Sequence, residues 1–235
     1  MRRLLTVLSV AVLASGALAA PAAAQQSLSI YGGRFSPNGE DSRIQENGFS
    51  NDVLVNNLDF LLFDLDDFKG GTFGADYLIA LGEYVEAGLG VGYYKKTVPS
   101  IYADLENANG SEIEQDLKLR IVPMTATVRF LPIGRTTPVQ PYIGAGVGVF
   151  AWKYTESGEF VDFDDNIFRA TYEGSGSSAG PLILGGVRFP LGNFDLGGEV
   201  RWQKAEGELP ADQFFSADKI DLGGWTWAAT FNIRF

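Results

Sequence analysis

Apolar and polar residues alternate along most of this chain, and the alternation is clearest in two stretches that resemble each other. In residues 84–97 the odd-numbered positions from 85 to 93 are apolar, whereas glycine occupies most of the even-numbered ones between them. Residues 142–153 align with residues 84–95 without a gap, and half of the aligned positions are identical. Because successive side chains of a β-strand point to opposite faces, each stretch predicts a strand with one apolar face.

The same period-two pattern predicts eight strands along the chain. They are expected near residues 27–36, 72–82, 84–97, 113–131, 140–155, 179–190, 194–206 and 221–235. The fourth, sixth and eighth of them end on an apolar residue followed by Arg and Phe, as in Val128-Arg129-Phe130. A β-sandwich whose edge strands resemble one another by chance is the alternative interpretation of this repetition.

The connections between the expected strands alternate in length. They are short after the second, fourth and sixth strands, and long and polar after the others. The long outer loops are expected at about residues 37–71, 98–112, 156–178 and 207–220. Short turns at one end and long loops at the other are typical of a membrane barrel whose strands run up and down.

Two local features modify this layout. In the fourth strand the apolar residues change parity beside Pro123, and since proline cannot donate to a β-ladder, a β-bulge is expected there. In the first long loop, a short helix capped by Ser50 or Asn51, followed by an extended stretch, is expected; the alternative is that this segment extends the second strand above the membrane.

The face opposite the apolar one carries charge, and this decides between a soluble and a membrane barrel. The charged residues on that face are Asp76, Glu86, Arg129, Arg188, Asp195, Glu199, Arg201 and Arg234. A soluble barrel packs aliphatic residues inside, so this many charges in its core are implausible. A lipid-spanning sheet must instead close on itself and turn its apolar face outward. The sequence therefore predicts an all-β fold, an eight-stranded antiparallel up-and-down transmembrane β-barrel.

The first 24 residues differ from the rest. A charged start, an apolar run and a small-residue site before Gln25 predict a cleaved secretory signal peptide at residues 1–24. Residues 25–235 are then expected to form a single barrel domain. The formal net charge of −11 argues against a nucleic-acid partner, which would need clustered cations.

The composition also argues against catalysis. The chain contains no Cys and no His, which excludes thiol nucleophiles, thiolate metal sites and the commonest general base. Asp76 and Glu86 are the one carboxylate pair considered for acid–base work, and an ion-pair role suits them better. The stretch from Asp162 to Asn166 resembles a calcium loop only weakly, because Ile167 stands where that loop needs glycine. No enzyme activity, cofactor or metal site is predicted.

The leader, the eight strands and the terminal "FNIRF" resemble the small outer-membrane β-barrel family, which includes the OmpA-, OmpX- and OmpW-type barrels. The resemblance covers essentially all of residues 25–235. It implies that the protein lies in the outer membrane, in contact with its lipid and lipopolysaccharide, as a monomer. It also implies that the last strand is a signal read by the barrel-assembly machinery, carried here by Trp227, Phe231, Ile233 and Phe235.

An eight-stranded barrel is just wide enough for side chains to fill it. The Arg residues that end three of the strands are expected to meet carboxylates, notably Glu86 and Asp195, and to form an ionic plug near the periplasmic mouth. The alternative is that each Arg simply reaches periplasmic water.

A structural or surface-interaction role follows from a plugged interior. The alternative is a passive channel or carrier for small hydrophobic molecules, which would need an apolar tunnel. Tyr94, Phe150 and Trp152 could line such a tunnel, with residues 60–63 as its lid. A third possibility is adhesion through the long loops.

Overall fold

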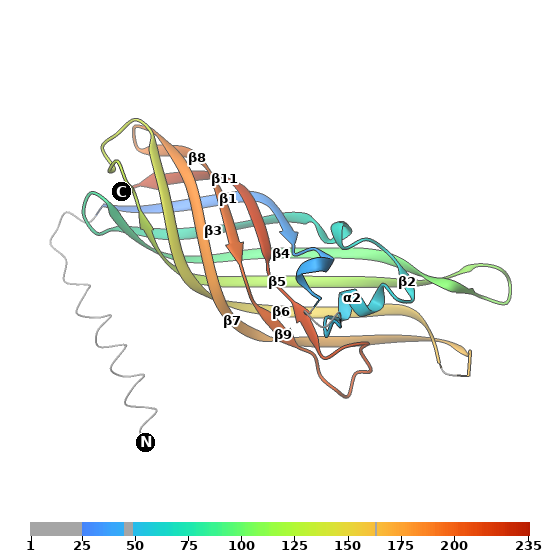
Figure 1. The fold of residues 1–235 in the computed structure, drawn as a ribbon. Helices are drawn as coiled ribbons and strands as arrows, with labels where there is room; N and C mark the ends of the chain where they lie inside the picture. Colours follow the sequence, from blue (N-terminus) through green and yellow to red (C-terminus); the bar gives the residue numbers. More distant parts are fainter. Residues whose placement is uncertain (1–24, 45–48, 163) are drawn as a thin grey trace, which may run out of the picture.

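The computed structural model describes residues 25–44, 49–162 and 164–235, so the signal-peptide prediction lies outside the described residues. Eight long strands form one closed antiparallel barrel (Figure 1). They are β1 (Gln26–Pro37), β3 (Gly70–Ala80), β4 (Val85–Glu106), β5 (Glu112–Phe130), β6 (Gln140–Val161), β7 (Ile167–Leu191), β8 (Phe194–Gln203) and β11 (Gly224–Arg234). Each pairs with the next along the chain, and β1 pairs with β11 to close the ring. The predicted fold class is confirmed.

The two ends of the barrel differ, as expected. Figure 1 shows the short turns and the C-terminus at one end and the long hairpins at the other. Between β1 and β3 lie η1 (Glu40–Ser42), α2 (Val53–Asn57), β2 (Leu61–Leu62) and η2 (Leu65–Phe68); between β8 and β11 lie β9 (Glu206–Glu208) and β10 (Lys219–Asp221). Within the described residues, no helix is long and apolar enough to cross a bilayer.

Two of the expected outer loops are mostly strand. Residues 98–112 continue the β4–β5 hairpin, and residues 156–178 continue the β6–β7 hairpin, which is paired from Gln140–Arg188 out to Val161–Ile167. The polar, Ser- and Gly-rich sequence there predicts loop. It remains β-structure because the two arms of each hairpin satisfy each other's backbone groups, and a strand in water needs no apolar outer face.

The helix prediction is confirmed with a different cap. The side chain of Asp52, not of Ser50 or Asn51, accepts the Leu54 N–H at 3.0 Å and starts α2. Ser50 is engaged elsewhere: its hydroxyl donates to the Arg43 carbonyl and accepts the Asp52 N–H.

The β-bulge expected beside Pro123 is absent from the register of β5. Tyr94 opposes Ile121 and Val91 opposes Met124 in a single register with β4, and Pro123 opposes Phe150 in an unbroken register with β6. The same parity of residues faces inward along the whole strand, but the medium that each face contacts changes. Below Pro123 the outward residues are apolar, whereas above it the inward residues Leu119 and Ile121 are buried and apolar. The parity change marks the height at which β5 leaves the membrane.

In the lower part of the barrel the apolar residues face outward, whereas in the upper part they face inward, as in a soluble protein. At the outer end, an apolar core fills the interior and joins the barrel to the long connections. It consists of Phe35, Val53, Leu54, Leu61, Leu65, Phe68, Tyr94, Val98, Leu117, Leu119, Ile121, Phe150, Trp152, Tyr154, Ala205, Leu209, Ile220 and Leu222. We call this set the outer core. Helix α2 supplies Val53 and Leu54, both fully buried, to this core.

An apolar belt surrounds the lower part. On β6 the outward residues run from Ile143 to Ala151, which matches the 9–11 residues that a tilted strand needs to cross a bilayer. Phe130, Phe189 and Phe235 are exposed at the short-turn end, where an aromatic girdle is expected.

A charge placed in this belt should be costly. Val147 lies at the middle of the outward series of β6 and is 65% exposed. Val147→Arg is expected to lower the free energy of unfolding in lipid vesicles by about 2–4 kcal/mol, because the cation would lie near the bilayer midplane. Thr171→Arg, on the exposed outward face of β7 beyond the belt and opposite Ser157, is the control and should change it by less than about 0.5 kcal/mol. Similar losses in both variants, measured by urea titration, would contradict this position of the belt.

Candidate functional site

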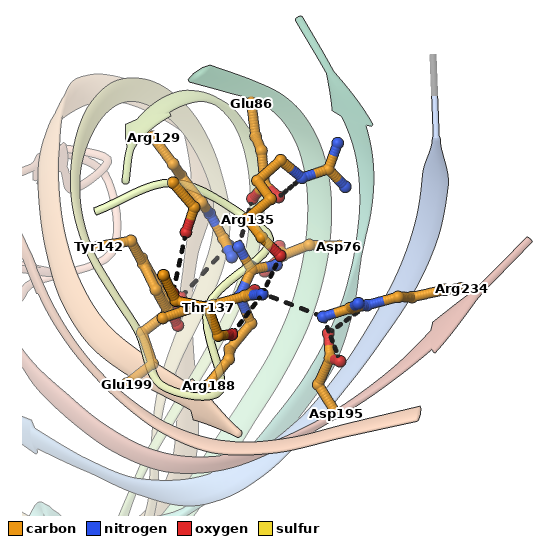
Figure 2. Close-up of polar contacts among 12 residues, drawn as sticks. Asp76, Glu86, Arg129, Arg135, Thr137, Tyr142, Arg188, Asp195, Glu199 and Arg234 are labelled. Atoms are coloured by element: carbon orange, nitrogen blue, oxygen red, sulfur yellow. Dashed lines mark hydrogen bonds and ion pairs between the residues drawn. The ribbon is translucent and has the colours of Figure 1, made fainter. Parts of the chain in front are cut away.

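The lumen between the short-turn end and the outer core holds the charged residues predicted from sequence (Figure 2). All of them project inward because each lies on the face opposite the apolar belt. Arg129 on β5 is central: its guanidinium lies 2.8 Å from Asp76 and 3.3 Å from Glu199. Arg201 contacts the same two carboxylates. These four side chains form a neutral cluster of two cations and two anions contributed by three strands, β3, β5 and β8.

A second cluster lies nearer the short-turn mouth. Glu86 on β4 accepts from Arg188 on β7 at 2.8 Å, and the Nε of Arg135 lies 3.4 Å from the same carboxylate. Arg135 belongs to the turn between β5 and β6 and was not predicted as a site residue. The turn folds back over the lumen, held by the Gln140 side chain, which donates to the Arg135 carbonyl. No pattern in the sequence reports such a fold-back.

A third group, one ion pair, joins β8 to β11. Arg234 contacts Asp195 at 2.5 Å and also donates to the side chain of Gln140 at 3.3 Å. Every lumen carboxylate predicted from sequence therefore contacts at least one guanidinium. The strand-end arginines were expected to meet Glu86 and Asp195 without individual pairs being assigned: Arg188 contacts Glu86 and Arg234 contacts Asp195, whereas Arg129 pairs with Asp76 and Glu199, higher in the barrel.

Tyr142 links the clusters and was also missed. Its ring lies between two guanidinium groups, 5.2 Å from that of Arg129 and 5.1 Å from that of Arg188, and its hydroxyl donates to Glu199 at 2.8 Å. The available signal was parity, because Tyr142 lies on the glycine-rich inward face of β6. A cation over an aromatic ring is attracted by the negative face of the ring, which helps to hold both arginines.

Inward glycines make room for these side chains. A Cβ at Gly90 would lie 2.0 Å from the carboxylate of Asp76, and one at Gly186 would lie 2.5 Å from the hydroxyl of Tyr142. The absence of side chains at these inward glycines therefore leaves the space that the charged and aromatic side chains occupy.

Above the ion pairs, little space remains. A cavity of about 30 Å³ lies between Arg201, Thr72 and the outer core, room for about one water molecule. Tyr94, Phe150 and Trp152, the residues considered as a tunnel lining, are 3%, 0% and 3% exposed and pack in the outer core. Of the lid residues 60–63, Leu61 is buried, whereas Phe60 and Leu62 face outward. Tyr94, Phe150, Trp152 and Leu61 therefore pack together in the outer core.

One carboxylate is buried in the outer end without a cation in contact among the described residues. Glu156 on β6 accepts from Asn57 of α2 at 2.7 Å and from the hydroxyl of Tyr154 at 2.9 Å. Ser216 in turn donates to Asn57 at 2.6 Å, so the network ties three segments together. Burial raises the pKa of Glu156, although both hydrogen bonds oppose the shift.

The raised pKa of Glu156 makes the stability of this region depend on pH. A carboxyl group with a raised pKa binds its proton more tightly in the folded state, so stability is highest at acidic pH and falls as pH rises through the window above the ordinary carboxyl value. Amides of α2 and outer β6 are therefore expected to exchange hydrogen faster at pH 8 than at pH 5, after correction for intrinsic rates. Glu156→Gln should reduce that difference, and Asp52 at the start of α2, whose pKa burial also raises, accounts for the remainder; an unchanged pH dependence in this variant would assign it to Asp52 alone.

The predicted insertion-signal residues lie on the last strand as expected from parity. Trp227, Phe231 and Phe235 are 61%, 39% and 65% exposed on the outside of β11, and Ile233 shares their face. Residues Gln26 and Phe235 exchange two backbone hydrogen bonds where β11 meets β1.

Comparison with known proteins agrees with this architecture. No protein-family model and no curated protein sequence matches the chain. The crystal structure of the outer membrane protein OprG from Pseudomonas aeruginosa is similar over 90% of this chain and 97% of that one, at 15% sequence identity and a TM-score of 0.50. This chain has the eight-stranded fold of small outer-membrane β-barrels. A major outer membrane protein from Thermus thermophilus (15% identity, 91% and 100% covered, TM-score 0.46) and Neisserial surface protein A (14%, 90% and 97%, 0.47) are also similar.

Proposed function

We propose that the protein is an integral outer-membrane barrel with a closed lumen, which acts through its outer surface and not as an axial channel. The observation that carries the proposal is the double closure of the interior. Ion pairs fill the lower lumen, the outer core fills the upper part, and about 30 Å³ of space lies between them. A structural or surface-interaction role fits a barrel whose long hairpins extend beyond the membrane.

We also propose that the protein is exported to the outer membrane and assembled there. Residues 1–24 would direct export and be cleaved, and the barrel-assembly machinery would read Trp227, Phe231, Ile233 and Phe235. The assembled barrel would be a monomer in contact with outer-membrane lipid and lipopolysaccharide. The apolar belt supports this location, because its width fits a bilayer.

Liposome flux tests the closed lumen. Purified protein reconstituted in vesicles should give no swelling with small sugars and no stable single-channel steps, whereas an open porin reconstituted in parallel gives both. Folding in each preparation is checked by the shift in electrophoretic mobility between boiled and unboiled samples. Steady conductance from heat-modifiable protein would overturn the proposal.

A second candidate function rests on a break in the hydrogen bonding of the wall. β7 pairs with β8 only as far as Leu182, and beyond the bond from the Lys204 N–H to the Pro181 carbonyl, no backbone hydrogen bond joins β7 to β9 in the described chain. A hollow of about 430 Å³ lies at this break in the hydrogen bonding of the wall, bordered by residues 176–179, Glu206 and Trp152. The Trp152 indole N–H has no hydrogen-bond partner among the described residues.

Through this hollow a small hydrophobic molecule could reach the outer core from the side, which is the carrier alternative in lateral form. Gly176→Leu would narrow the hollow, because a Cβ at Gly176 already lies 3.3 Å from the indole. Cells producing this variant should take up an apolar fluorescent dye more slowly than cells producing the same amount of wild-type protein. Equal uptake, with both proteins folded, would remove this candidate.

A further inference from the structure

Four cations lie side by side on the outward face of three adjacent strands. Lys95 on β4 is the direct cross-strand partner of Arg120 on β5, and Arg120 is the direct partner of Lys153 on β6. Lys118 is the next outward residue of β5. Lys95 and Arg120 are exposed, and the other two are half-buried. We call these four residues the cation row.

The row lies at one defined height on each strand. On β4 the outward residues from Val85 to Tyr93 are apolar, and the next is Lys95. On β5 the outward residues from Phe130 to Val122 are apolar, and the next is Arg120; on β6 the series ends at Ala151, and the next is Lys153. Each cation is therefore the first outward residue beyond the apolar belt, at the long-loop end of the barrel. This is the height at which the headgroups of the outer leaflet begin.

The protein alone does not balance these charges. Like charges placed directly opposite each other on neighbouring strands are destabilising. Lys153 contacts Glu173 at 2.6 Å, but in the described part of the chain Lys95, Lys118 and Arg120 make no ion pair. The chain as a whole is acidic, with a net charge of −11, so a row of cations is a local departure from its general character.

The row is also bounded on its outer side. Beyond Lys118, the outward residues of β5 are Asp116, Glu114 and Glu112. An anion attracted to the row is therefore repelled by the surface immediately above it, which confines it to a band between the apolar belt and these carboxylates. A membrane-embedded anionic headgroup occupies such a band, whereas a large soluble polyanion would also meet the acidic surface.

We propose that the cation row binds the phosphate groups of an outer-leaflet glycolipid whose acyl chains lie against the apolar belt of β4, β5 and β6. This inference rests on the proposed outer-membrane location. Arg120 suits a phosphate group because its planar guanidinium presents paired donors, and the flanking lysines add compact positive charge on flexible stems. The same contacts would remove the repulsion between the cross-strand cations.

The test compares glycolipids that differ only in phosphate. Folded full-length protein in neutral detergent with EDTA is titrated with bisphosphorylated lipid A, with dephosphorylated lipid A, and with inorganic phosphate, and binding is followed by thermophoresis. EDTA prevents metal ions from bridging the lipid to the acidic residues. Wild-type protein should bind the phosphorylated lipid much more tightly than the other two probes.

The variant removes three charges of the row: Lys95→Gln, Arg120→Gln and Lys153→Gln combined. A lysine or arginine near an anionic surface contributes about fivefold in affinity, so roughly a 100-fold loss for phosphorylated lipid A is expected. The matched control, Arg169→Gln, Lys204→Gln and Lys219→Gln combined, removes as many cations from elsewhere on the outer end. It should bind within about twofold of wild type.

Three results would overturn the inference. These are equal binding of both lipids, equal losses in the two triple variants, or inorganic phosphate bound as tightly as the lipid. If they occur with heat-modifiable protein recovered from the outer membrane, the proposed function still stands. Wild-type protein that is not recovered from the outer membrane would overturn both.

Discussion

Arg129→Met is expected to destabilise the barrel by about 3–5 kcal/mol, the cost of breaking a buried ion pair from one side. Arg129 is 1% exposed, and its removal leaves Asp76 and Glu199 to share one cation, Arg201. One negative charge then lies in the lumen without compensation, and the contact of Tyr142 with its upper guanidinium is lost. Urea unfolding in lipid vesicles, followed by electrophoretic mobility, measures the loss.

The double variant Asp76→Asn with Arg129→Met is the control. It retains Glu199 with Arg201, a neutral pair, so most of the lost stability should return even though the barrel carries two substitutions instead of one. Conductance provides a second readout, because a loosened ion-pair layer should begin to leak in the single variant before it does in the double. A double variant no more stable than the single one would show that packing of the Arg129 side chain matters, not its charge.

The fold could be predicted because each membrane-spanning strand alternates apolar and polar residues with a period of two. Wherever one face meets lipid, apolar residues must occupy every second position, so the faces of β4 and β6 were readable directly. The closure of the ring followed from the same physics, since an open sheet edge cannot lie in lipid.

The period-two rule gave wrong predictions for the residues that lie beyond the membrane. There the outward face meets water and the inward face meets the outer core, so the apolar parity of β5 reverses at Pro123 without any change in register. A change in which face of the strand is buried and a β-bulge both produce the same change of apolar parity in the sequence. The hairpin extensions resemble loops in sequence for a related reason, because outside lipid a strand can be polar on one face and rich in serine and glycine on the other.

The lumen was predicted as a set of charges, but its pairing was only partly predictable. The arginines and carboxylates near the ends of the strands could be placed at the same mouth of the barrel, but not assigned to one another individually. Arg129 lies directly opposite Glu86 on β4, yet its guanidinium contacts Asp76 and Glu199 instead. Arg135 reaches the lumen from a turn, and Tyr142 acts through the face of its ring; neither contact leaves a periodic signal.

The last strand provides a prediction in which assembly and stability separate. Deleting Phe235 is expected to reduce the amount of protein in the outer membrane by roughly tenfold or more if the terminal aromatic residue is the part of the insertion signal that the assembly machinery reads. The folded barrel should lose only about 1–3 kcal/mol, because the side chain is 65% exposed and the backbone loses two hydrogen bonds to Gln26, about 0.5–1.5 kcal/mol each.

The two effects are measured on separate samples. Outer-membrane levels are compared in cells by heat-modifiable mobility, and stability is measured on protein refolded from urea into vesicles, where no assembly machinery is present. Phe235→Tyr, which keeps a terminal aromatic ring, is the matched control and should assemble nearly as well as wild type. If the deletion lowers the two quantities in proportion, Phe235 contributes only as part of the wall; if only the level in cells falls, the exposed ring at the end of β11 is recognised during insertion, before the strand pairs with β1 and closes the barrel.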